Sequence, residues 1–230
     1  MNFDGFMARG NCVAIAPMKQ PILTCAATLF LCFPLAACDS PAGPTPEPSQ
    51  QDLFFERLSL LCGKAYAGIL VSEQEADADM AGKPMIMHAA SCDLHEIQIP
   101  FHIAEGSDKW DRSRTWIVTR TDNGLRLKHR HRHEDGSLDS VTNYGGDTES
   151  DGTADRQEFP ADAESIASFK ANGLDQSVTN VWAVEISPPG QSDAQFSYEL
   201  RRPETSDGRH FRVEFDLSRP VTPPPAPWGD

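Results

Sequence analysis

The fold is decided by residues 115–133, TWIVTRTDNGLRLKHRHRH. Residues 115–121 are rich in branched and aromatic side chains, which favours a strand, and DNG at 122–124 predicts a hairpin turn because Asn-Gly tolerates positive φ. In the returning segment, 125–133, leucines and histidines alternate with arginines and a lysine, so the two kinds lie on opposite faces. Because four unpaired cations do not bury, the leucine face is predicted to be the inner one.

The same two-residue period recurs on both sides of this hairpin, without a βαβ rhythm. Apolar or alternating segments cover residues 66–72, 83–90, 96–104, 139–144, 156–159, 178–186, 196–200 and 211–217. The sequence therefore predicts a mainly β fold of about nine or ten short antiparallel strands, as a barrel or, alternatively, a β-sandwich.

Two short helices accompany these strands. Residues 52–62 repeat apolar side chains at helical spacing, with Asp52 available to cap the start and Gly63 to end the helix. Residues 162–170 predict the second helix. The first helix leads into GKAYAG at 63–68, and a helix followed by a Gly-x-aromatic strand resembles the start of calycin-type barrels, the lipocalin-like and nitrobindin-like folds. This resemblance favours a calycin-like barrel over a sandwich.

The N-terminal segment is typical of a secretory signal peptide, with a positive start at Met18-Lys19 and an apolar run over residues 21–35. Leu35-Ala36-Ala37-Cys38 resembles the lipobox of bacterial lipoproteins. The resemblance implies cleavage of the leader and acylation of Cys38, and hence a protein anchored to the inner or outer membrane and facing the periplasm or the exterior. The alternative is an ordinary signal peptide with a chance cysteine.

The chain accordingly divides into five segments. Residues 1–17 are interpreted as a mis-called extension, because Met18 begins the better signal peptide, and 18–37 as the leader. A proline-rich tether over 38–51, a single domain over 52–219 and an unpacked proline-rich tail over 220–230 follow.

The net charge is −14, with 20 basic and 34 acidic residues. Removing residues 1–37 takes away Arg9, Lys19 and Asp4, which leaves 18 basic and 33 acidic residues and a charge of −15. Such a surface repels phosphate backbones, which argues against a nucleic-acid partner. Solubility is the simplest interpretation of the acidity.

Two of the six cysteines are expected to form a disulfide. Cys12, Cys25 and Cys32 leave with the leader and Cys38 takes lipid, so Cys62 and Cys92 remain as an even pair in an oxidising compartment. A redox or metal pair is the alternative, but no CxxC spacing supports it.

The inner face of the hairpin carries the candidate binding residues His129, His131 and His133. Histidine inside a barrel suits a haem-like group, a polar ligand or a proton relay, and zinc with one or two further donors. The possible further donors are His88, His95, Glu134 and Asp135. In the alternative interpretation the strand end lies in solvent and its polar side chains face the chain's many carboxylates.

A second candidate site is an acidic loop that matches the calcium-binding EF-hand template by position. Its carboxylates are Asp147, Glu149, Asp151, Asp155 and Glu158. The preceding residues indicate a strand and turn instead of a helix, so a solvated acidic hairpin loop is the alternative.

The chain contains no GxSxG, HExxH, GxGxxG or P-loop motif, and no feature of it requires a cofactor. The first hypothesis is a non-enzymatic barrel that binds a small apolar or haem-like ligand. The second is an envelope structural or interaction protein with a filled core, and the third is an envelope metal binder. If the large residues Phe101, Trp116, Phe211 and Phe215 fill the interior, no ligand site remains.

Overall fold

The computed structural model describes residues 47–203 and 208–230. The leader, the lipobox with Cys38 and most of the proline-rich tether lie outside the described residues. Among the helices that are described, none is long and apolar enough to cross a membrane.

The described chain forms one antiparallel sheet with short helices at its ends. The elements, in chain order, are α1 (Gln50–Ser59), β1 (Ala65–Leu70), the 3-10 helix η1 (Glu75–Asp77), β2 (Met85–His88), β3 (Ser91–Cys92), β4 (Glu96–Ala104), β5 (Trp110–Thr121), β6 (Gly124–His131), β7 (Tyr144–Asp147), β8 (Arg156–Pro160), α2 (Ala163–Ala171), the 3-10 helix η2 (Asp175–Thr179), β9 (Val181–Ile186), β10 (Gln195–Arg202) and β11 (Arg209–Val221).

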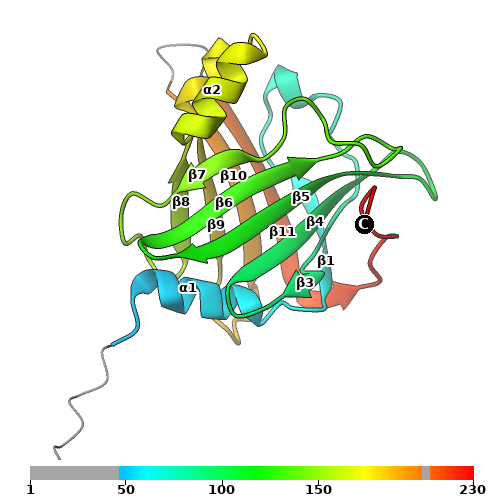
Figure 1. Cartoon of the computed structure of the whole chain (residues 1–230). Helices are drawn as coiled ribbons and strands as arrows, with labels where there is room; N and C mark the ends of the chain where they lie inside the picture. Colours follow the sequence, from blue (N-terminus) through cyan, green and yellow to red (C-terminus); the bar gives the residue numbers. More distant parts are fainter. Residues whose placement is uncertain (1–46, 204–207) are drawn as a thin grey trace, which may run out of the picture. The chain divides into compact units, whose positions relative to one another are not determined.

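The strands follow the order β7-β6-β5-β4-β2-β1-β11-β10-β9-β8, and β3 pairs with β4. The sheet curls until its two edge strands, β7 and β8, meet (Figure 1). There the Asp162 N–H donates to the Gly145 carbonyl at 2.9 Å, and the Ser165 hydroxyl bonds both the N–H and the carbonyl of Gly145 at 2.8 Å. The mainly β, barrel-like prediction is confirmed, and the two-layer alternative is wrong.

Helix α1 covers one end of the barrel and α2 lies at the other (Figure 1). Phe54 and Leu58 of α1 are fully buried in the core. Ser49 caps the helix, and Asp52 completes a capping box from the third helical position. The prediction of Asp52 as the cap was therefore wrong, and the last residues assigned to the tether belong to the helix.

Strand β7 lies later than predicted. Residues 139–143 are loop, and the strand is Tyr144–Asp147. Its Gly-Gly pair had indicated a turn, but a Cβ at Gly145 would lie 1.9 Å from the Leu127 carbonyl oxygen. The glycines are therefore required by close strand packing, not by a turn.

The predicted proline-rich tail contacts the sheet at several points, although none of residues 220–230 is buried. Strand β11 continues to Val221, and the Trp228 N–H donates to the Arg112 carbonyl at 3.2 Å. Arg130 forms an ion pair with Asp230 at 2.9 Å. The segment crosses the outer face of the sheet, where its carboxylate neutralises a cation of β6.

The predicted disulfide is confirmed, since Cys62 and Cys92 are bonded. The bond joins the turn after α1 to β3, and thereby ties the helix that closes one end to the wall of the barrel. In the bonded state neither sulfur is a thiolate that could bind a metal.

Candidate ligand cavity

A cavity of about 280 Å³ occupies the end of the barrel next to α2. Strands β4, β5, β6, β7, β9, β10 and β11 supply most of its wall. The segments around η1, α2 and η2 and the loop before β7 contribute the remaining residues. The lining residues are Met80, Phe101, Arg114, Trp116, His129, His131, Val141, Tyr144, Phe169, Leu174, Ser177, Asn180, Trp182, Tyr198, Leu200, Arg209 and Phe211.

Four large residues, Phe101, Trp116, Phe211 and Phe215, were expected to show whether the barrel interior is filled or hollow. All four are buried, and Phe215, which is fully buried, does not line the cavity. Phe101, Trp116 and Phe211 form part of its wall. The interior is therefore filled over part of its length and hollow at the α2 end.

The cavity wall is mainly aromatic. The Trp116 ring stacks between Phe101, at a centroid distance of 4.7 Å, and Tyr198, at 4.4 Å. On the same lining, His129 stacks on Tyr144 at 4.7 Å. Flat π-faces of this kind favour planar ligands, which gain stacking energy beyond the burial of apolar area.

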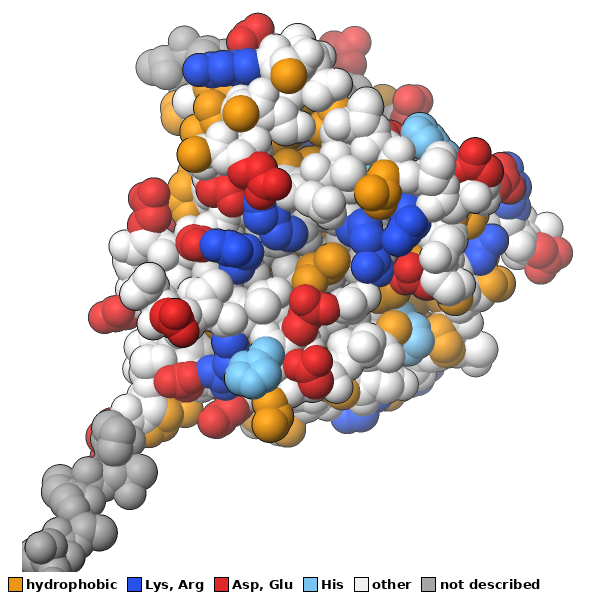
Figure 2. Space-filling view, in the orientation of Figure 1, with side chains coloured by type: hydrophobic (Ala, Val, Ile, Leu, Met, Phe, Trp, Pro, Cys, Tyr) orange, Lys and Arg blue, Asp and Glu red, His pale blue; other side chains and the backbone are white. Residues whose placement is uncertain are grey.

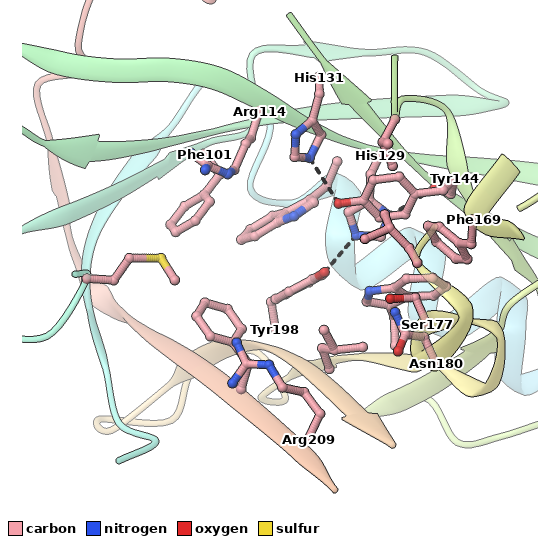
Figure 3. A pocket seen from close by; sticks show the side chains of 17 residues that line it. Phe101, Arg114, His129, His131, Tyr144, Phe169, Ser177, Asn180, Tyr198 and Arg209 are labelled. Atoms are coloured by element: carbon pink, nitrogen blue, oxygen red, sulfur yellow. Dashed lines mark hydrogen bonds between the residues drawn. The ribbon is translucent and has the colours of Figure 1, made fainter. Parts of the chain in front are cut away.

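His129 is fixed as a neutral ring. Its Nδ1–H donates to the Tyr144 carbonyl at 3.0 Å, so Nε2 is unprotonated and accepts the Tyr198 hydroxyl at 2.7 Å (Figure 3). Burial lowers the pKa of His129 to about 3, although the bond to the Tyr144 carbonyl opposes the shift. Both ring nitrogens are occupied, so His129 supports the wall and does not offer a free metal ligand.

His131 also faces the cavity, and its Nε2 shares a hydrogen bond with the Tyr144 hydroxyl at 3.0 Å (Figure 3). Burial, followed by the positive charge of Arg114, lowers the pKa of His131 to about 4. Burial likewise raises the pKa of Tyr144 to about 12. These side chains are therefore uncharged donors and acceptors at neutral pH.

His133 does not belong to the cavity, so its place in the histidine trio was wrong. It is exposed and follows the end of β6, where its N–H bonds the Ser137 carbonyl at 2.8 Å. The alternation stops because the chain turns there.

The basic face of β6 points outward as predicted, and its cations are paired. Arg126 bonds Asp147 in a bidentate pair at 2.5 and 2.8 Å, and Lys128 pairs with Asp162 and Glu164 at 2.8 Å each. Figure 2 shows acidic and basic side chains next to each other over this face.

The predicted metal ligands do not come together. Within residues 47–203 and 208–230, no group of three or more His, Cys, Asp or Glu is arranged to hold a metal ion. None of His88, His95, Glu134 and Asp135 lines the cavity.

The carboxylates of the acidic loop are spread over β7, β8 and the segment between them. Asp147 pairs with Arg126, Asp155 with Arg57, and Glu158 with Arg156 and Arg201. Glu149 and Asp151 are exposed. The geometry thus favours the acidic hairpin loop over the calcium site.

Two arginines of the lining were missed by sequence reasoning. Arg114 pairs with Asp111, and both Nη atoms of Arg209 bond Asp77, which is 1% exposed. The alternation did contain the signal, because Arg114 shares the face of Trp116. Arg114 was not identified because cations were assumed to lie only on the solvent-exposed face of a strand.

Asn180 adds an unsatisfied polar group to the lining. The residue is 6% exposed, and its Oδ1 is buried without a hydrogen-bond partner among the described residues. Its side-chain amide lies beside Ser177 (Figure 3). A buried polar group without a partner costs free energy unless a ligand or water satisfies it.

Comparison of the chain with protein-family models, with curated proteins and with solved structures found no match. The geometry of the cavity is therefore the basis for assigning a function to the chain.

Proposed function

We propose that this protein is a lipid-anchored envelope protein that binds a small, mainly apolar ligand and carries out no chemistry on it. The observation that carries the proposal is the aromatic cavity at one end of a barrel whose remaining interior is packed. Binding sites are typically concave, mainly apolar and equipped with few polar groups, and this lining has that composition.

The size of the cavity limits the ligand. Its volume of about 280 Å³ is roughly twice the ~150 Å³ of a cavity that holds benzene. We therefore expect a ligand of about two fused rings. A haem-like group is disfavoured, because both nitrogens of His129 are already hydrogen-bonded and the haem ring system is much larger.

The lipobox at residues 35–38 supports the membrane anchor, and the Cys62–Cys92 disulfide suits an oxidising compartment such as the periplasm or the exterior. The domain begins with α1, and the cavity lies at the opposite end, next to α2 (Figure 1).

Titration of the full chain with 2-naphthol, a neutral two-ring probe, tests the proposal by calorimetry. Val141 lines the cavity, whereas Leu138, on the same loop, is 51% exposed and does not. We expect Val141→Trp to fill the cavity and abolish binding, and Leu138→Trp to leave binding unchanged. Equal binding by both variants, or no binding by the unmodified chain, would contradict the proposal.

A further inference from the structure

The polar groups of the lining indicate which ligands the cavity would select. We infer that the ligand is a small aromatic carboxylic acid, with its ring against the aromatic wall and its carboxylate on the Nε–Nη2 edge of Arg114. The inference rests on the proposed function and specifies the chemical class of the ligand.

Arg114 has a free binding edge. Its Nη1 bonds Asp111 and the Ser113 hydroxyl, whereas Nε and Nη2 make no hydrogen bond to the described residues. The side chain is 32% exposed and lines the cavity (Figure 3). A guanidinium edge with two parallel N–H groups matches a carboxylate in a bidentate pair.

Arg209 is already paired through both of its Nη atoms with Asp77, a carboxylate that is 1% exposed. The Gln74 side-chain oxygen accepts a further bond from Nη1 at 2.9 Å. These bonds hold the segment around η1, which contributes Met80 to the cavity. Arg209 therefore positions the segment around η1, and we assign binding of the carboxylate to Arg114.

The charge distribution agrees with an anionic ligand. The whole chain has 34 acidic and 20 basic residues, yet the cavity lining contains two arginines and no aspartate or glutamate. The positive charge of Arg114 also contributes, after burial, to the lowered pKa of His131. Asp111, which pairs with Arg114, and Asp139 oppose this shift.

The aromatic wall supplies the second half of the recognition. Trp116 lies two residues after Arg114 on the same strand face, and its ring continues the stack between Phe101 and Tyr198. Side chains two residues apart on a strand share a face at about 6.5–7 Å. A carboxylate attached to a two-ring system spans such a distance.

Calorimetry of the full chain with 1-naphthoate and its neutral isostere 1-naphthamide tests the inference. We expect the unmodified chain to prefer naphthoate by roughly tenfold or more, as a charge-assisted bidentate pair would provide. Arg114→Gln should remove this preference. The matched control Arg126→Gln removes the same charge from the outer face of β6 and should retain it.

If Arg114→Gln does not fold, as judged by circular dichroism, Arg114→Lys replaces it, and this variant should lose most of the preference because lysine lacks the fork. A preference that persists in the Arg114 variant, or equal affinity of the unmodified chain for both compounds, would overturn the inference. In the latter case binding of naphthamide would still support the proposed function. Failure of both compounds and of 2-naphthol to bind would overturn both proposals.

Discussion

Burial keeps His129 and His131 uncharged on the inner face of β6, and the two rings hold Tyr198 and Tyr144 in place. An imidazolium at either position would place a charge in an aromatic interior without a carboxylate on the lining. The same residues that shape the cavity therefore link its stability to pH.

The pH dependence follows from the pKa values of the buried histidines. The pKa is lowered from 6.5 to about 3 for His129 and to about 4 for His131. Burial also lowers the pKa of His102 to about 4; this residue of β4 is 1% exposed and does not line the cavity. Below pH 6.5 the unfolded chain binds protons that the folded chain does not, so the free energy of unfolding falls as pH falls. Each histidine contributes up to about 1.4 kcal/mol per pH unit between its two pKa values.

Urea unfolding at pH 7, 6 and 5 measures this dependence. Below that range carboxylates with lowered pKa values, such as Asp111 and Glu185, would add their own dependence. His131→Asn should reduce the slope by about one proton. A free energy of unfolding that does not change between pH 7 and 5 would contradict the assigned burial.

The alternation of the hairpin predicted correctly that His129 and His131 face the interior, but it was wrong for one residue at each end of the hairpin. It included His133, because a period of two does not reveal where a strand stops. It omitted Arg114, because a cation is buried only where a partner such as Asp111 neutralises it. The position of Asp111 depends on a shift in the pairing register of β4 with β5, which the period of two does not predict.

Among the secondary-structure elements, the close contact between the edge strands β7 and β8 requires a glycine at position 146. A Cβ at Gly146 would lie 1.7 Å from the Pro160 carbonyl oxygen. We expect Gly146→Ala to separate the two strands and to lower the free energy of unfolding by several kcal/mol, because the obstacle is backbone.

Urea unfolding compares Gly146→Ala with Gly190→Ala. Gly190 has a φ of 85°, but its Cβ would meet nothing within 4 Å. The control should therefore lose only the backbone term, about 1–2 kcal/mol. An equal decrease in the free energy of unfolding in the two variants would show that β7 and β8 are not tightly packed against each other.

The Cys62–Cys92 disulfide also stabilises the arrangement of the elements. The bond closes a segment with a sequence separation of 30, and in the chain-entropy model it stabilises the fold by about 3–4 kcal/mol. Cys62→Ser combined with Cys92→Ser should lower the urea midpoint accordingly, and dithiothreitol should lower it only in the unmodified chain. An unchanged midpoint in the double variant would contradict this role.

Most elements could be predicted because each has a local signal. The strand over 96–104 was predicted with the bounds of β4, and the helix over 162–170 lies within a residue of α2. Strand β7 could not be placed, because Gly145 and Gly146 favour a turn in isolation. Only their contact with Leu127 and Pro160, which lie far along the chain, makes them strand residues.

At the scale of the whole molecule, periodicity predicts a barrel but does not determine how full it is. The volume that remains depends on how Phe101, Trp116 and Tyr198 stack against each other, and on how α1 and α2 cover the ends. The interior is packed at the end covered by α1 and contains the cavity at the end next to α2.

We expect this hollow end of the barrel to hold a small ligand in the cell. Native mass spectrometry of the protein, isolated from the cells that produce it, would detect that ligand. We predict an additional mass of a small organic acid that is lost on denaturation and is missing from Val141→Trp. A bound mass of the same size in both proteins, or none in the unmodified protein, would contradict the account.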